Sequence, residues 1–229
     1  MCIRDRAGGS GTRMGGTVPK QFQSLNGKPI LYHTIKTLQN CETISEIILV
    51  VPEKEYETAN TDWSGKLEIV KKVVIGGEKR QDSVYNGFCE VSQDSEIVLV
   101  HDGVRPFLSQ KMIADSIDAA REYGAAITAI PVHDTIKRVD TSGLVSQTID
   151  REGLWRVQTP QAFRYSLLLD AFNKAKSENF YGSGGMKTKI DAAKVCQLSG
   201  CKMVIANGLP LRPCLLYTSD AADERSSVD

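Results

Sequence analysis

The sequence lacks a long apolar run, a paired cysteine motif and an excess of either charge. Its apolar runs, of which Ile47–Val51 is typical, are far shorter than the roughly 20 residues that cross a bilayer. No apolar segment follows the charged residues 1–6, so no secretory signal is predicted. Lysine and arginine number 28, as do aspartate and glutamate, which argues against a basic nucleic-acid surface. We therefore expect neither a membrane nor a nucleic acid as partner.

The six cysteines include no Cys-x-x-Cys pair, and the chain has only three histidines. A zinc site needs a cluster of such ligands at close spacing, so none is expected. Scattered cysteines of this kind are typical of a reducing compartment, and we expect a cytoplasmic protein.

Both familiar phosphate-binding loops are also missing. No glycine is followed by Lys-Ser or Lys-Thr as in a P-loop, and Met14 stands where the dinucleotide fingerprint needs its third glycine. What is present at 7–21 is a different glycine-rich loop with two cations, Arg13 and Lys20. Glycines let backbone amides approach phosphate oxygens closely, and the two cations supply charge. An ordinary basic surface loop is the alternative.

Most of the chain alternates apolar strands with amphipathic helices. Such alternation predicts one α/β domain with a doubly wound, mostly parallel, Rossmann-like sheet, whose ligands bind at the carboxyl ends of the strands. The expected strands are 46–51, 67–75, 96–100, 125–132 and 202–206, and the expected helices are 30–38, 82–91, 109–123, 165–177 and 191–198. Residues 154–163 are expected to be irregular and 178–189 to form a loop.

Residues 133–152 interrupt the alternation. Two short β-like flanks, 135–139 and 144–149, enclose a turn at Thr141-Ser142-Gly143. We expect a β-hairpin arm that projects from the sheet.

Two further segments follow strands of the predicted sheet. Residues 76–83 (GGEKRQDS) lead into a helix, whose first amides favour anions, although an ordinary strand-to-helix turn would read similarly. Asp102 ends another strand, where a carboxylate can hold Mg²⁺ together with a triphosphate. The alternative for Asp102 is a structural ion pair with Arg105, and both can be true.

These segments together resemble the nucleotidyltransferases that act on sugar and polyol phosphates. The run at 9–21 matches GxGxRMxxxxPKQ, 76–83 matches GG[DE]xRxxS, and 101–106 matches HD[AG]xRP. PVxDTxKR at 131–138, T[IV]xR at 148–151, Leu-Trp at 154–155 and QTPQxF at 158–163 also match. The combination is most similar to the 2-C-methyl-D-erythritol 4-phosphate cytidylyltransferase family, over about residues 7–172.

The resemblance implies transfer of CMP from CTP to the polyol phosphate, with release of pyrophosphate, by a homodimer that uses Mg²⁺ or another divalent cation. It implies three groups of site residues. The catalytic residues would be Arg13, Lys20 and Arg151, with Arg151 reaching the neighbouring subunit. The nucleotide would bind to Ala7, Gly8, Gly9, Gly11, Gly77, Glu78, Arg80, Ser83, Asp102 and Gly103. The polyol phosphate would bind to Asp102, Arg105, Thr135, Arg151 and Thr159, and the metal to Asp102.

The two ends depart from the family. Back-translated, residues 1–6 and 214–218 give nearly complementary strings, the pattern of a sequencing adapter read in both orientations. We therefore expect a single domain at 7–212, truncated at both ends, with residues 1–6 and 213–229 of non-native origin. The family's C-terminal NIK[IV]T motif is absent, and its TD[DE]A motif is only partly matched at 190–193.

Two other functions remain open at this point. Ribitol 5-phosphate cytidylyltransferase has similar loops and also acts on a polyol phosphate, although the runs DREGLW and QTPQAF favour the erythritol enzyme. A nucleotide-binding module without turnover is the alternative from another class.

Overall fold

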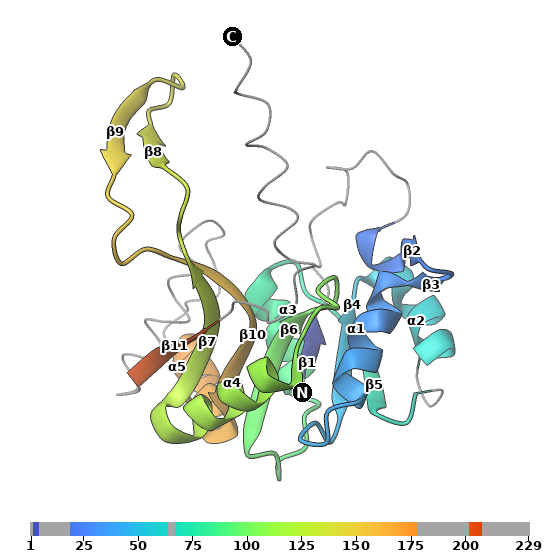
Figure 1. Cartoon of the computed structure of the whole chain (residues 1–229). Coiled ribbons are helices and arrows are strands. Elements are labelled where there is room, and N and C mark those ends of the chain that lie inside the picture. Colours follow the sequence, from blue (N-terminus) through green and yellow to red (C-terminus); the bar gives the residue numbers. More distant parts are fainter. Residues whose placement is uncertain (1, 5–18, 64–66, 178–201, 208–229) are drawn as a thin grey trace.

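The computed structural model describes residues 2–4, 19–63, 67–177 and 202–207, and within them a seven-stranded sheet forms the centre of the molecule (Figure 1). Its strand order is β11-β7-β10-β6-β1-β4-β5. In chain order these strands are β1 (Cys2–Arg4), β4 (Ile47–Val51), β5 (Val70–Ile75), β6 (Ile97–Asp102), β7 (Gly124–Pro131), β10 (Trp155–Arg164) and β11 (Lys202–Asn207). All neighbouring pairs are parallel except those of β10, which runs antiparallel to β6 and β7. The expected mostly parallel α/β sheet is confirmed.

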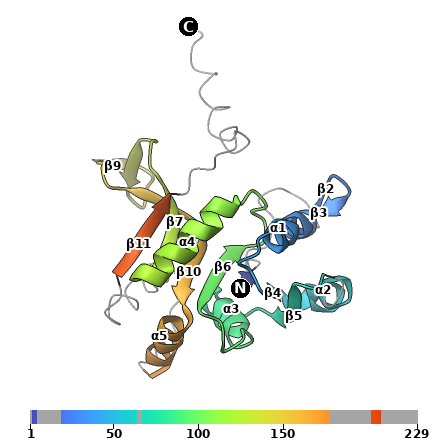
Figure 2. The same ribbon diagram turned by 60° about the horizontal axis from the view of Figure 1, so that its bottom comes forward.

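Helices cover both faces of the sheet (Figure 2). One face packs against α1 (Ile30–Gln39), α2 (Tyr56–Trp63) and α4 (Gln110–Tyr123), and the other against α3 (Arg80–Phe88) and α5 (Tyr165–Ser177). Within β4, Leu49 belongs to the first core and Ile48 to the second, because successive strand residues point to opposite faces. Burial on both faces explains why this strand is a continuous apolar run rather than an alternating one.

The start of α1 follows directly from its sequence. The strands β2 (Ser24–Leu25) and β3 (Lys28–Pro29) pair around Asn26-Gly27, whose φ angles are 50° and 75°. Asn-Gly suits such a two-residue hairpin because both residues tolerate positive φ. Pro29 then caps a helix whose buried residues Leu31, Ile35 and Leu38 lie on one face, and each stabilises the fold by roughly 1.5–3 kcal/mol.

The amphipathic helix expected at 109–123 is confirmed as α4. The Ser109 hydroxyl accepts a hydrogen bond from Met112 N at 3.1 Å, as expected of an N-cap. Gly124, with a φ of 94°, ends the helix and begins β7.

The expected arm at 133–152 is present and projects beyond one edge of the sheet (Figure 1). Its strands β8 (Ile136–Val139) and β9 (Val145–Ile149) are antiparallel. At the tip, Asp140 accepts bonds from the amides of Ser142 and Leu144, at 2.9 and 3.0 Å. These bonds fix the tight turn that the sequence predicted.

The prediction for residues 154–163 is wrong. Residues 154–163 are not irregular, because β10 occupies Trp155–Arg164 between β6 and β7. Proline normally interrupts a central strand, since it lacks the donor for the ladder. Here the pairing of β10 with β7 shifts between Val157 and Gln161, around a cis Thr159-Pro160 bond. The strand therefore accommodates Pro160 at an irregularity and continues.

The remaining differences are smaller. The helix expected at 82–91 is α3 at Arg80–Phe88, and α2 was not expected at all. Two single-turn 3₁₀ helices, η2 (Lys20–Phe22) and η3 (Glu53–Glu55), complete the described elements. The loop at 178–189 and the helix at 191–198 lie outside the described residues.

Residues 2–4, for which a non-native origin is predicted, form the central strand β1 between β4 and β6. The origin of both ends stays a prediction. Of the described helices, none is long and apolar enough to cross a membrane.

Candidate active site

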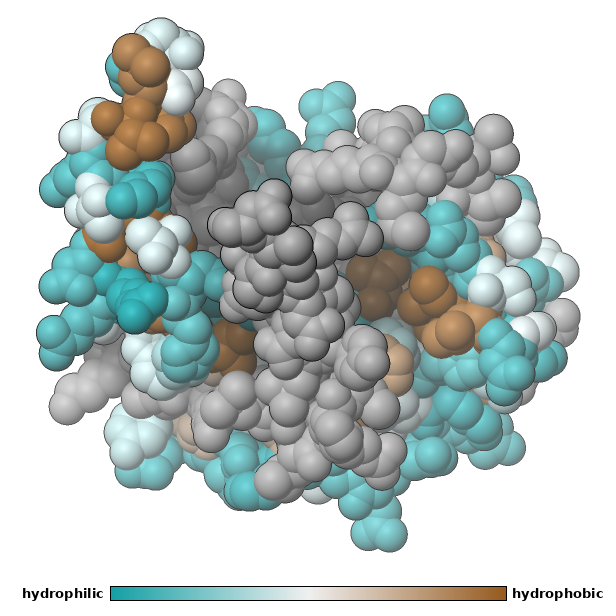
Figure 3. Space-filling view, turned by 45° about the horizontal axis from the view of Figure 1, so that its top comes forward, coloured by the Kyte–Doolittle hydropathy of each residue, from teal (hydrophilic) through white to brown (hydrophobic). Residues whose placement is uncertain are grey.

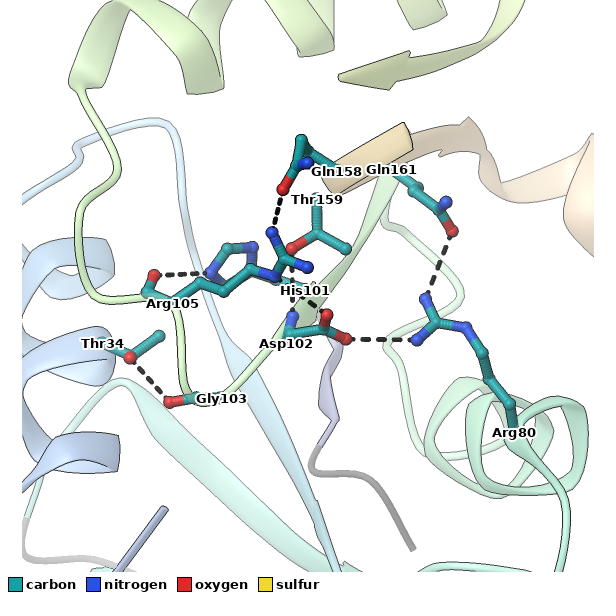
Figure 4. Close-up of polar contacts among 9 residues, drawn as sticks. All are labelled: Thr34, Arg80, His101, Asp102, Gly103, Arg105, Gln158, Thr159 and Gln161. Carbon is teal, nitrogen blue, oxygen red and sulfur yellow. Dashed lines mark hydrogen bonds and ion pairs between the residues drawn. The ribbon is translucent and has the colours of Figure 1, made fainter. Parts of the chain in front are cut away.

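The candidate site lies where β5 and β6 end, at one edge of the sheet. These strands are parallel members of the sheet, so their carboxyl ends reach the same edge, as do the loop before α3 and the turn after β6. The antiparallel β10 brings Gln158–Gln161 to this edge from the opposite direction. Figure 4 shows these segments meeting around Asp102.

Asp102 lies between two arginines. Its Oδ1 is 3.1 Å from Arg80 NH1, and its Oδ2 is 3.0 Å from Arg105 Nε. Partial burial by itself would raise the pKa of this carboxyl, but the two guanidinium charges outweigh burial and hold the pKa below its usual value. One anion and two cations leave the cluster with a net positive charge, which favours a phosphate-bearing ligand.

The ion pair between Asp102 and Arg105 that was weighed as a structural alternative is therefore present. It is not a closed internal pair, because the Arg105 side chain is 43% exposed. Arg80, at 33% exposed, is also open to the surface. Both guanidiniums are thus held in place by the carboxylate and remain accessible to a ligand.

Strand β10 supplies a second set of partners to the same cluster. Arg105 NH1 donates to Gln158 Oε1, and Arg80 NH2 donates to Gln161 Oε1 at 3.5 Å. Thr159 Oγ1, almost fully buried, accepts from Asp102 N at 3.3 Å. Each arginine therefore lies between the shared carboxylate and a glutamine of its own (Figure 4). This arrangement orients both arginines before any ligand arrives.

The loop before α3 is shaped by its own side chains. Ser83 is fully buried, and its hydroxyl accepts from Gly77 N at 3.1 Å while facing the carbonyls of Gly77 and Lys79 at 3.2 Å each. Ser83 thus maintains the shape of the loop from inside. Gly77 is required by packing, because an added Cβ would lie 2.4 Å from Asp82 Cβ. Glu78 is exposed on this loop.

The structure does not bring every predicted site residue to this cluster. Thr135 and Arg151 are exposed on the arm, where Arg151 donates to the carbonyl of His133. Lys20 opens the single turn η2. The predicted residues Ala7, Gly8, Gly9, Gly11 and Arg13 lie outside the described residues.

Sequence reasoning missed four residues that contact this site: Thr34, His101, Gln158 and Gln161. The sequence carried a signal for Thr34, a polar residue on the buried face of α1, since a buried hydroxyl requires a partner. His101 is fully buried, and its Nε2 donates to the carbonyl of Arg105 at 3.0 Å. Burial lowers the pKa of His101 to about 4, so it is neutral at pH 7 and faces away from solvent.

Among the described residues, Asp102 would hold a divalent cation together with a ligand that supplies other oxygens. The described residues contain no group of three or more histidine, cysteine, aspartate or glutamate side chains that could hold a metal. A carboxylate has about four lone-pair positions, and each oxygen of Asp102 accepts one arginine bond, so one position remains on each. That fits Mg²⁺, which commonly uses one or two carboxylates and the phosphates of a substrate.

An α/β sheet with oriented arginines at its carboxyl edge, beside a glycine turn at a helix start, defines a protein that binds phosphorylated ligands. Comparison with known proteins identifies the group. The family profile of IspD, 2-C-methyl-D-erythritol 4-phosphate cytidylyltransferase, matches residues 2–220. The chain belongs to this family.

Individual relatives support the same family. The enzyme of that name from Syntrophus aciditrophicus is 45% identical over 179 residues, covering 77% of this chain and 76% of the relative. Its counterpart from Clostridium botulinum is 48% identical over 174 residues, covering 76% and 77%. Among solved structures, the Francisella tularensis cytidylyltransferase superposes with a TM-score of 0.70 at 26% identity, covering 90% of this chain and 89% of that one.

Proposed function

We propose that this chain transfers CMP from CTP to 2-C-methyl-D-erythritol 4-phosphate and releases pyrophosphate, a step of isoprenoid precursor biosynthesis. The observation that carries the proposal is the oriented cluster of Arg80, Asp102 and Arg105 at the carboxyl edge of the sheet. Membership of the family and the names of the relatives supply the two substrates.

The reaction needs no general base from the protein. The nucleophile is an oxygen of the polyol phosphate, whose second pKa is about 6 by analogy with phosphoserine, so it is already ionised at pH 7. This oxygen forms a bond to the α-phosphorus of CTP, and the bond from that phosphorus to the bridging oxygen breaks. Pyrophosphate leaves with the bonding electrons. His101, neutral and buried against the carbonyl of Arg105, is not placed to remove a proton.

The main catalytic contribution is electrostatic. Negative charge concentrates around the α-phosphorus as the bond forms, and cations fixed beforehand stabilise it without reorganisation. We assign Arg13 and Lys20 to the triphosphate, and Arg80 to the nucleotide beside Asp102. Arg105, Thr159 and, on the arm, Thr135 bind the polyol phosphate.

Mg²⁺ would be held by Asp102 and the triphosphate oxygens. When bound, the ion neutralises charge on the phosphates. Arg80 and Arg105 keep Asp102 ionised at neutral pH, because they hold the pKa of its carboxyl below the usual value.

The loop from Gly77 to Ser83 is the proposed cytidine site, together with Gly103 and the glycine loop at Ala7–Gly11. Ser83 and Asp82 fix its backbone, through the bond to Gly77 N and a 3.1 Å bond from Lys79 N to Asp82 Oδ2. A backbone of fixed shape can present amides and carbonyls to the edge of a pyrimidine. Glu78 borders this site.

The arm is the proposed dimer contact. An isolated hairpin is marginally stable, and Val139, Leu144 and Val145 near its tip are 55%, 68% and 63% exposed. Figure 3 shows apolar surface at this tip, upper left. Burying it against a second copy would remove that surface from water and bring Arg151 to the partner's site. We place this homodimer in the cytoplasm.

A pyrophosphate-release assay tests the function. The chain is supplied with CTP, Mg²⁺ and either 2-C-methyl-D-erythritol 4-phosphate or ribitol 5-phosphate. We expect release that depends on the erythritol substrate. A preference for ribitol 5-phosphate would show that this compound, not the erythritol phosphate, is the substrate. CTP binding without pyrophosphate release in the presence of either compound would favour a nucleotide-binding module.

A further inference from the structure

The turn after β6 accepts hydrogen bonds from side chains that have no role in the proposed reaction. This site turn, residues 102–107, carries Asp102, Gly103 and Arg105. Three of its carbonyls accept hydrogen bonds from side chains outside it. The pairs are Thr34 Oγ1 to Gly103 O at 2.7 Å, His101 Nε2 to Arg105 O at 3.0 Å, and Thr37 Oγ1 to Pro106 O at 3.0 Å.

Thr34 stands out among these donors. A threonine inside a helix can return its hydroxyl hydrogen to the carbonyl four residues earlier. Thr37 has such a carbonyl at 2.9 Å, that of His33, in addition to Pro106 O. For Thr34 the equivalent carbonyl, that of Ile30, is 3.5 Å away, whereas Gly103 O is at 2.7 Å. Its one hydrogen is therefore directed out of α1 and into the site turn.

Both ends of this hydrogen bond are enclosed. Thr34 is fully buried, and Gly103 is also buried. A buried carbonyl that loses its donor is unfavourable, so the backbone moves to find another partner. Asp102 and Arg105 lie one and two residues from Gly103, so such a movement displaces the carboxylate and the guanidinium together. Figure 4 shows Thr34 and Gly103 on the side of the turn away from Gln158 and Gln161.

We propose that Thr34 is a positioning residue, whose buried hydroxyl fixes the Gly103 carbonyl and thereby places Asp102 and Arg105 for the transfer reaction. The inference rests on the proposed cytidylyl transfer for its consequence in catalysis. A displacement of about 1 Å at a site of this kind can reduce the rate by about 100-fold, even when the altered residue does not touch the substrate.

Three variants test this. Thr34→Val keeps the shape of the side chain and removes the donor, whereas Thr34→Ser keeps the donor. Ile35→Val is the matched control, because Ile35 is the next residue of α1, is equally buried and makes no side-chain hydrogen bond. Each variant is compared with the wild type in kcat, KM for both substrates, and Tm.

We expect Thr34→Val to lower kcat/KM by about 10- to 100-fold, mainly through kcat, because the reacting groups are misplaced. Thr34→Ser should stay within about threefold of the wild type. Ile35→Val should lower Tm and leave kcat/KM nearly unchanged, since its loss is one of packing alone. Wild-type kcat/KM in Thr34→Val, or equal losses in the valine and serine variants, would overturn the proposal.

Hydrogen exchange gives a readout that does not depend on turnover. The amide of Arg105 bonds to Asp102 O at 3.1 Å within the site turn. Exchange of the peptide containing residues 102–107 should accelerate by about tenfold in Thr34→Val and not in Thr34→Ser or Ile35→Val. If the wild type showed no transferase activity, the proposed function would fail, and this measurement would still decide whether Thr34 holds the turn. Unchanged exchange in Thr34→Val would contradict it.

If Thr34→Val does not fold, Thr34→Cys replaces it, because a thiol is of similar size and only a weak donor. Its kcat/KM should fall below that of Thr34→Ser, and equal values for the two would count against the proposal.

Discussion

At the scale of single residues, the arrangement centres on Asp102. A carboxylate with one arginine on each oxygen is both a structural pair and a means of orienting two cations. Exposure of both arginines reduces what the pairs contribute to stability, since exposed ion pairs contribute only about 0–1 kcal/mol. Their orientation matters more for the site, because preorganised charge acts most strongly where a transition state develops charge.

His101 predicts a pH dependence of stability. Its pKa is about 4 in the folded chain, against about 6.5 in an unfolded one. Between pH 6.5 and pH 4 the His101 side chain binds a proton in the unfolded chain but not in the folded chain. The contribution of His101 to the free energy of unfolding is therefore complete above pH 6.5 and is lost as the pH falls toward 4. The complete loss is roughly 3 kcal/mol. Urea unfolding at pH 7, 6 and 5, without nucleotide or divalent cation, measures it.

The control for this effect is His101→Gln, which keeps an amide donor for Arg105 O and does not titrate. All other ionisable groups are shared, so the difference between the two pH profiles isolates His101. Parallel profiles would show that His101 does not resist protonation in the folded chain.

Gly77→Ala tests the nucleotide loop. The new Cβ would lie 2.4 Å from Asp82 Cβ, so the loop must move and Arg80, the first residue of α3, must move with it. We expect KM for CTP to rise about tenfold or more, because displaced contacts weaken nucleotide binding. Lys71→Ala, a truncation of an exposed side chain on β5 outside the proposed cytidine site, serves as the control and should leave KM unchanged. Unchanged KM in Gly77→Ala would mean that this loop does not bind the nucleotide.

At the scale of elements, the sequence predicted most of the helices and parallel strands but not β10. Continuous apolar runs such as Ile47–Val51 and the helical spacing in α1 and α4 are local signals. Strand β10 contains Arg156, Gln158 and Pro160, and its place between β6 and β7 depends on pairing partners far away in the chain. Non-local pairing of this kind leaves little trace in periodicity.

The candidate site, like the fold, could be predicted where its signals are local in the sequence and not where its contacts are between distant residues. Asp102 at a strand end and the loop at 76–83 could be recognised from motifs that are contiguous in the chain. The contacts of Arg80 with Gln161, and of Thr34 with Gly103, join residues 81 and 69 positions apart. Only the folded sheet brings these pairs together, so the sequence could indicate that Thr34 needs a partner but not which one.

If the arm forms the proposed dimer contact, two variants of low activity should complement each other. Lys20→Ala and Arg151→Ala should each lower kcat by about 100-fold or more, because each removes a charge that we propose stabilises the transition state. If Arg151 serves the partner's site, a mixed dimer has one intact site, built from Lys20 of one subunit and Arg151 of the other. Mixing the two variants under conditions of subunit exchange should restore about a quarter of wild-type activity, since about half of randomly paired dimers are mixed.

Two outcomes would contradict the arm's assigned role. No recovery, with mixed dimers confirmed by mass, would place Arg151 in the site of its own chain. A monomer by light scattering at micromolar concentration with full activity would exclude the dimer altogether.

At the scale of the whole molecule, one sheet edge combines the loop before α3, which we propose as the cytidine site, with the positive cluster around Asp102. We expect CTP to be used over ATP and GTP by at least about 100-fold in kcat/KM, because the wrong base would leave polar groups of the proposed cytidine site unpaired. Competition between the triphosphates at equal concentration measures this ratio. Equal use of a purine triphosphate would show that the loop at Gly77–Ser83 does not select cytidine.

The central claim is that the substrate phosphate attacks the α-phosphorus of CTP. Tracing radioactive phosphorus tests it most directly, with CTP labelled at either the α or the γ position and 2-C-methyl-D-erythritol 4-phosphate as acceptor. The account predicts that the α label appears in the cytidine diphosphate-linked polyol and the γ label in pyrophosphate, in equal amounts and only when the acceptor is present. Appearance of the α label in free CMP, or of the γ label in inorganic phosphate without pyrophosphate, would contradict it.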